Sequence, residues 1–160
     1  IRDVCSITHD NDETYSGARC IVIAIRAIIE GSWRGDKNLI ELIIPQIPDT
    51  RVRDRLLAIK AIEDLKEVGS MGYDGYVVHS VPLAIAAVNQ IGDLGIKGIY
   101  EQLINIGGDT DTNCSIAGQI AGALVGFKGL PNELIEKMEK LGEYAWVKRV
   151  VDELITQEKW

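Results

Sequence analysis

The residues best suited to chemistry lie in the run Gly107-Gly108-Asp109-Thr110-Asp111-Thr112. The two glycines allow the backbone to turn tightly, so the carboxylates of Asp109 and Asp111 can point to one side of a loop. Residues two positions apart could not share one face of a helix. Two carboxylates with a threonine hydroxyl suit a hard cation such as Mg²⁺, Mn²⁺ or Ca²⁺. The pattern indicates either a metal site or simple N-capping of the helix that follows, because Asp and Thr are both helix caps.

Other metal sites with a similar appearance do not fit. An EF-hand loop needs glycine at its sixth position and glutamate at its twelfth. Counted from Asp109, those positions are Cys114 and Ile120. The cysteines and histidines lack the spacing of a zinc site.

Two ring-bearing residues are candidates for contacting a substrate. His9 lies just ahead of an apolar helix, where side chains often face a cleft; the alternative is a hydrogen-bonded histidine at a surface turn. Tyr76 follows the glycine-rich segment 69–75 and could stack on a base or sugar ring; the alternative is a core tyrosine with a satisfied hydroxyl. His79 has the same ambiguity as His9.

The elements that must position these residues are all predicted to be helices. Apolar residues recur at helical period, and no alternating run long enough for a strand occurs. We expect helices over 12–30, 36–45, 51–67, 80–89, 96–105, from the residues after Thr112 to Gly126, over 131–141 and over 145–157. The predicted fold is all-α, a compact orthogonal array of helices. Glycines in a helix interior are costly, so Gly118, Gly122 and Gly126 suggest the close approach of another helix.

Composition excludes several classes of protein. The 160 residues carry a formal net charge of −7. That charge argues against sequence-independent nucleic-acid binding and against a polybasic membrane anchor, so we expect neither nucleic acid nor membrane as a partner. No signal peptide is visible, and the longest apolar stretch, 20–29, is too short for a membrane span and contains Arg26. Three widely spaced cysteines show no pairing framework, which favours a cytoplasmic protein.

Three blocks of the sequence together resemble the ADP-ribosylglycohydrolases, which include the dinitrogenase-reductase-activating glycohydrolases and the hydrolases of ADP-ribosylated arginine and serine. The block from Gly107 to Thr112, with the small-residue segment 116–126, resembles the C-terminal signature of that family. Thr8-His9 with the helix ending at Glu30-Gly31 resembles its central segment. The segment 75–84, from Gly75 to Ala84, resembles the stretch before its penultimate core helix.

The resemblance implies an all-α fold with a dinuclear Mg²⁺ or Mn²⁺ site, and hydrolysis of the bond joining ADP-ribose to a protein side chain or similar acceptor. By position, Asp109 and Asp111 would be the catalytic carboxylates, and with Thr112 they would be metal ligands. His9, Tyr76, Gly107 and Gly108 would contact the bound ADP-ribose. The substrate would be an ADP-ribosylated protein or a small molecule bearing ADP-ribose.

Two other motifs of the family, a Thr-Asp-Asp-Thr run and a Gly-Asn-Gly segment, do not occur in these 160 residues. We therefore expect residues 1–160 to be the C-terminal portion of one ADP-ribosylglycohydrolase-like domain, working with a complementary N-terminal fragment or chain. The helix around 20–25 and the glycine-striped helix are apolar on more faces than a surface helix needs, which points to the same partner. The alternatives are a catalytically inactive crystallin-like or regulatory relative and a Ca²⁺-stabilised structural domain.

Overall fold

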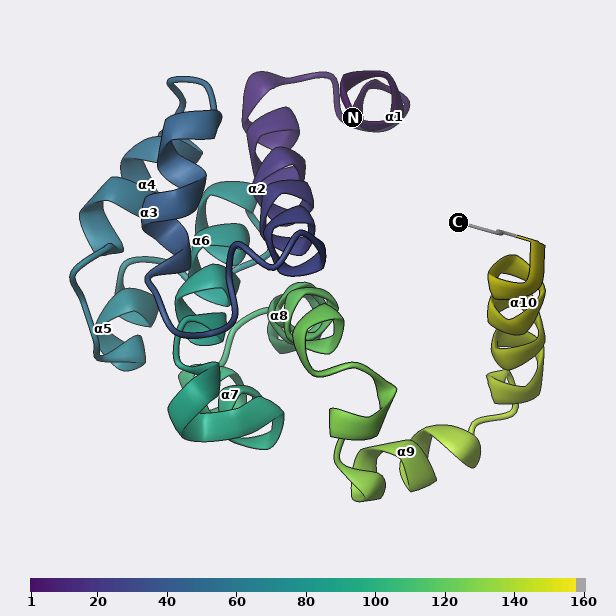
Figure 1. Cartoon of the computed structure of the whole chain (residues 1–160). Coiled ribbons are helices and arrows are strands. Elements are labelled where there is room, and N and C mark those ends of the chain that lie inside the picture. Colours follow the sequence, from purple (N-terminus) through teal and green to yellow (C-terminus); the bar gives the residue numbers. More distant parts are fainter. Residues whose placement is uncertain (158–160) are drawn as a thin grey trace.

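The computed structural model describes residues 1–157, and the all-α fold class is confirmed. The helices, in chain order, are α1 (Arg2–Ser6), α2 (Asp12–Ile29), α3 (Leu39–Ile43), α4 (Arg51–Ile59), α5 (Leu65–Ser70), α6 (Val77–Val88), α7 (Ile91–Ile106), α8 (Thr110–Val125), α9 (Asn132–Glu139) and α10 (Tyr144–Gln157), with 3₁₀ turns η1 (Ile44–Gln46) and η2 (Phe127–Gly129). Helices α2 to α8 form a bundle, and α9 and α10 extend away from it as an arm (Figure 1).

Helix α6 is the centre of the bundle. It packs against α8, α4, α2, α7 and α5, and ten of its twelve residues are buried. Such a helix is apolar all round because neighbours surround it on every side. Helix α8 packs against α6, α2 and α7, so the loop before Thr110 is attached to the best-packed part of the molecule.

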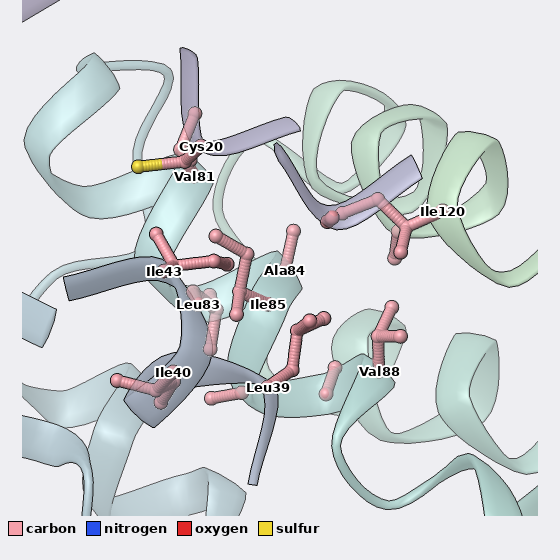
Figure 2. Close-up of a cluster of buried hydrophobic side chains, with 14 of the residues drawn as sticks. Cys20, Leu39, Ile40, Ile43, Val81, Leu83, Ala84, Ile85, Val88 and Ile120 are labelled. Atoms are coloured by element: carbon pink, nitrogen blue, oxygen red, sulfur yellow. The ribbon is translucent and has the colours of Figure 1, made fainter. Parts of the chain in front are cut away.

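The core is built from aliphatic side chains of several helices. Figure 2 shows Leu39, Ile40 and Ile43 of α3 gathered against Leu83 and Ile85 of α6, with Ile120 of α8 on the other side. Burial raises the pKa of the nearby Cys20 thiol to about 12. This thiol stays neutral at physiological pH and acts as a packing residue.

Several predicted helix boundaries were wrong. The segment 51–67 forms two helices rather than one: α4 ends at Ile59, and α5 starts after Asp64, which caps it by accepting from the Lys66 N–H. Helix α6 begins at Val77, three residues before Ser80, so Pro82 lies inside the helix. Helix α7 begins at Ile91 and is kinked at Gly95, where φ is +62°. The short helix α1 was not predicted.

The three glycines of the α8 stripe lie in three different environments. A Cβ at position 118 would lie 2.3 Å from the Tyr100 hydroxyl oxygen of α7, so Gly118 does allow close helix packing. Gly122 faces open space. Gly126 ends the helix with a φ of +64°. The prediction of close approach therefore holds at Gly118 alone.

The expected surplus of apolar surface occurs on α2 but not on α8, and a larger one occurs on α10, where it was not predicted. Helix α2 exposes Val22 and Ile29, but the exposed side chains of α8 are small or polar, such as Ser115 and Gln119. The largest exposed apolar face is on α10, formed by Trp146, Val147, Val151, Leu154 and Ile155. Among residues 1–157 no helix has both the length and the apolar character needed to cross a membrane.

Candidate functional site

The loop before α8 has the tight turn that its glycines predict. Gly107 and Gly108 have φ values of +88° and +73°, in the region that favours glycine. A Cβ at Gly108 would lie 2.5 Å from the Tyr73 carbonyl oxygen and closer still to its ring. Any other residue would push this loop away from the turn that precedes α6. The two glycines are therefore needed for the loop to reach its position.

Asp109 occupies the N-cap position of α8, but its carboxylate makes no capping hydrogen bond. Its backbone N–H instead donates to the Tyr73 carbonyl oxygen at 3.1 Å. The carboxylate lies against Gly75, where a Cβ would come within 2.2 Å of Oδ2. Capping alone does not explain an aspartate at this position, because the side chain is directed elsewhere.

Asp111 lies in the first turn of α8, since the helix begins at Thr110 rather than after Thr112 as predicted. The side chains of Asp109 and Asp111 nevertheless meet. Hydrogen bonding to the Asp109 carboxyl, and secondarily to the Thr112 backbone N–H, lowers the pKa of Asp111. A cation bound beside both carboxyl groups would offset the repulsion between their charges.

Asn113 supports the loop and was missed by the sequence analysis. Its side chain is fully buried, and its Nδ2 donates to the Tyr73 carbonyl at 3.0 Å. That carbonyl therefore receives two hydrogen bonds, one from Asn113 and one from Asp109. The Oδ1 of Asn113 is buried without a partner among the described residues. The available signal in the sequence was an asparagine directly after the motif that ends at Thr112.

His9 and Tyr76 come together although they are 67 positions apart. Both line a groove of about 430 Å³ between α2, α6 and α8, which also contains Gly75, Ser80 and Ile116. Tyr76 is 40% exposed, so the alternative of a core tyrosine was wrong. His9 is exposed and has no side-chain hydrogen bond within residues 1–157, and the cap of α2 is Asn11. The two predicted substrate residues thus share one groove.

The groove and the carboxylate pair are neighbours. A second hollow, of about 360 Å³, is lined by Asp111, Thr112, Ser115 and Ile116. Ile116 belongs to both hollows, and Gly75 joins the groove to the Asp109 carboxylate. All the predicted site residues therefore lie in one region, while their individual roles stay predictions.

Tyr76 has further neighbours that fix its ring. The His79 ring meets it edge-on, with 5.4 Å between the centroids. The guanidinium of Arg51 lies 5.6 Å from the Tyr76 centroid on the side of α4. A ring held in this way, with an exposed face, can stack on a flat group of a ligand.

The metal donors in this part of the chain are incomplete for a dinuclear site. Within residues 1–157 no group of three or more His, Cys, Asp or Glu residues could hold a metal ion together. Asp109, Asp111 and Thr112 offer hard oxygen donors, which are of the type that Mg²⁺ and Mn²⁺ prefer. The type of donor fits these ions, but the number of donors is sufficient for only part of a dinuclear site.

A larger hollow, of about 610 Å³, lies away from these residues, between the loop before α3 and the ends of α4 and α6. Its amide side chains bond to each other and to the backbone, for example Asn89 Nδ2 to Asn38 Oδ1 at 2.9 Å. It contains none of the predicted site residues. Size alone therefore does not make it the candidate site.

Comparison with known proteins is consistent with this arrangement. The chain is 28% identical over 136 residues to the ADP-ribosylarginine hydrolase Tri1 of Pseudomonas putida (strain GB-1), an alignment covering 83% of this chain and 34% of that protein. The chain thus spans about a third of the length of this relative. No solved structure matches the present chain significantly. The sequence model of one family, ADP-ribosylglycohydrolase, matches residues 1–160, and the chain therefore belongs to the ADP-ribosylglycohydrolase family.

Proposed function

We propose that this chain takes part in metal-dependent hydrolysis of the glycosidic bond that links ADP-ribose to a protein side chain, such as arginine, or to a similar acceptor. The observation that carries the proposal is that the Asp109 carboxylate lies against Gly75 in the groove of His9 and Tyr76, while Asp111 lines the adjoining hollow. The family match and the similarity to an ADP-ribosylarginine hydrolase support it.

Asp109, Asp111 and Thr112 would hold Mg²⁺ or Mn²⁺. When bound, such an ion supplies Lewis-acid polarisation of oxygen atoms near the anomeric carbon. The contribution of the chain is to place the carboxylates before any ion binds: Gly108 brings the loop against Tyr73, and the Tyr73 carbonyl holds the Asp109 N–H. Ligands fixed in advance lose less conformational freedom on binding.

The groove would receive the ADP-ribose. The exposed face of Tyr76 would stack on a ring of the ligand, and His9 at the opposite wall would donate or accept a hydrogen bond. Gly75, Gly107 and Gly108 have no side chains to exclude the sugar from the carboxylates. The groove thus gives orientation, and the carboxylate pair lies at its end.

A complementary N-terminal fragment or chain would complete the site. Two carboxylates and one hydroxyl are few ligands to hold two ions against water, so we expect further oxygen ligands from other residues. The exposed apolar side chains of α2 and α10 give such a fragment surface on which to pack. The relative extends over about three times the length that the alignment covers, which leaves ample chain for this part.

The test compares Asp111→Asn with a control, Asp93→Asn, at an exposed position of α7. Both variants are measured in the chain alone and with the complementary portion of the protein. We expect Asp111→Asn to weaken Mn²⁺ binding more than about 100-fold and to abolish hydrolysis, because it removes a ligand charge. Its thermal stability should change by no more than about 1 kcal/mol, since Asp111 lies in the first turn of α8 rather than at its cap, and only one favourable charge at that helix end is lost. Unchanged turnover in Asp111→Asn would refute the metal role.

The lack, within residues 1–157, of a third His, Cys, Asp or Glu beside Asp109 and Asp111 also favours a second candidate, a catalytically inactive crystallin-like or regulatory relative. The same titration separates the two. Binding of two Mn²⁺ ions by the assembled wild-type protein supports the hydrolase. Absence of binding in the assembly supports the inactive relative, and a preference for Ca²⁺ over Mg²⁺ indicates a structural calcium site.

A further inference from the structure

The turn between α5 and α6 is closed on itself by the carboxylate of Asp74. Its Oδ1 accepts from the Tyr76 backbone N–H at 3.0 Å and lies 2.8 Å from Nδ1 of His79. Because a carboxylate can only accept, Nδ1 of His79 carries the hydrogen. These bonds lower the pKa of Asp74, so it is ionised at neutral pH. The His79 ring also packs against Gly72, where a Cβ would lie 2.4 Å from Cγ.

The same turn supports the metal-site loop at two places. The Tyr73 carbonyl accepts from the Asp109 N–H at 3.1 Å and from Asn113 Nδ2 at 3.0 Å. Gly75 lies directly against Oδ2 of Asp109. Within residues 1–157, neither Asp74 nor His79 hydrogen-bonds to Asp109, so any effect they have on it must pass through the backbone between them.

The turn also carries the aromatic wall of the groove. Tyr76 has its N–H bonded to Asp74 and its ring against the edge of His79. Residues 73–76 are exposed and belong to no helix, so helix packing does not restrain them. The turn is therefore restrained by hydrogen bonds, those of Asp74 within it and those that the Tyr73 carbonyl accepts from Asp109 and Asn113.

We propose that Asp74 and His79 are a pair of positioning residues, which hold the 72–76 turn so that Tyr76 and the Asp109 carboxylate keep a fixed separation. This proposal rests on the proposed function, because the separation matters only if one substrate contacts both the Tyr76 ring and the carboxylates. Sites held by supporting hydrogen bonds bind and react better than sites that must be ordered by the ligand.

The test uses Asp74→Ala, with Asp74→Asn as the conservative partner, in the full chain. Amide hydrogen exchange is followed by NMR at Asp109, with Leu103 and Ile120 as references in the core. We expect Asp74→Ala to lower protection of the Asp109 amide about tenfold or more while the reference amides keep theirs. Asp74→Asn should restore protection to within about threefold, because its Oδ1 accepts the same two bonds.

A second variant, His79→Phe, keeps a ring against Gly72 and Tyr76 but removes the Nδ1 donor, and should also reduce protection at Asp109. Wild-type protection of Asp109 in Asp74→Ala would overturn the proposal. An equal loss at Leu103 and Ile120 would also overturn it, since the pair would then only stabilise the fold.

Mn²⁺ titration of the wild-type protein, assembled with the complementary portion, separates this proposal from the proposed function. Failure of the wild type to bind Mn²⁺ ends the proposed function. The exchange result at Asp109 still decides whether Asp74 and His79 position the loop, because it needs no metal and no substrate.

Discussion

The bundle of α2 to α8 and the arm of α9 and α10 contain similar amphipathic helices with very different burial. Ile120 of α8 is completely buried, whereas Ile155 of α10 is 69% exposed. Helix α8 packs against three other helices, while the principal neighbour of α10 is α9, and Figure 1 shows α10 standing apart from the bundle. The same residue type thus contributes to a core in one region and to an open surface in the other.

This difference teaches that an apolar stripe determines that a helix can be buried, but not what buries it. In the bundle, helices far apart in sequence cover one another, and the residues of the candidate site lie on the elements that they fix. In the arm, the stripe of α10 is exposed, and the Lys97 to Glu133 ion pair at 3.5 Å links α9 to α7. Packing, not helical propensity, supplies most of the stability of a helix.

The largest difference between the regions is expected for truncation of isoleucine. Ile120→Ala should lower the free energy of unfolding by about 2–5 kcal/mol, because it leaves a cavity in the core. Ile155→Ala should change it by less than about 0.5 kcal/mol, because the side chain is already in water. Urea denaturation of both variants measures the two values. Equal losses would mean that the arm packs on the bundle in solution.

Glycine substitution should give an intermediate effect that is specific to the site. Gly108→Ala should cost about 1–3 kcal/mol, since position 108 has a positive φ and a Cβ would collide with Tyr73. Gly142→Ala, between α9 and α10, is the control, because a Cβ there meets nothing within 4 Å. Thermal melts of both variants check this. A tolerated alanine at position 108 would show that the loop can move off the turn.

The smallest effect is expected for glutamates in the first turn of a helix. Glu13 of α2 accepts from the Arg51 and Val52 backbone N–H groups at 3.1 and 3.0 Å, and so caps α4 from another helix. Glu13→Ala should cost about 1–2 kcal/mol, because these N–H groups lose their acceptor.

Glu133 of α9 is the matched control. It pairs only with the exposed Lys97 and Lys137 among the described residues, and exposed ion pairs contribute little. Glu133→Ala should therefore cost less than about 0.5 kcal/mol in the same urea titration. A larger loss for Glu133 than for Glu13 would contradict the contrast between bundle and arm.

Local chemistry made much of the site predictable. Glycine at 107 and 108 predicts a tight turn, and that turn is present, because glycine tolerates the positive φ that the loop needs. The start of α2 after Asn11 and its end before Gly31 also follow from capping preferences. The prediction of one helix over 51–67 was wrong because its apolar stripe continues across residues 60–64, where α4 has already ended and Asp64 caps a new helix.

The sequence by itself determined the all-α class, the carboxylate motif and the candidate substrate residues, because periodicity, caps and glycine turns act over a few positions. Only the tertiary structure decided that His9 and Tyr76 share a groove, that Asp109 is held by Tyr73, and that Asn113 is buried beneath them. Each of these depends on contacts between helices far apart in the chain. Such contacts form where packing brings them together, and a linear pattern does not encode the partner.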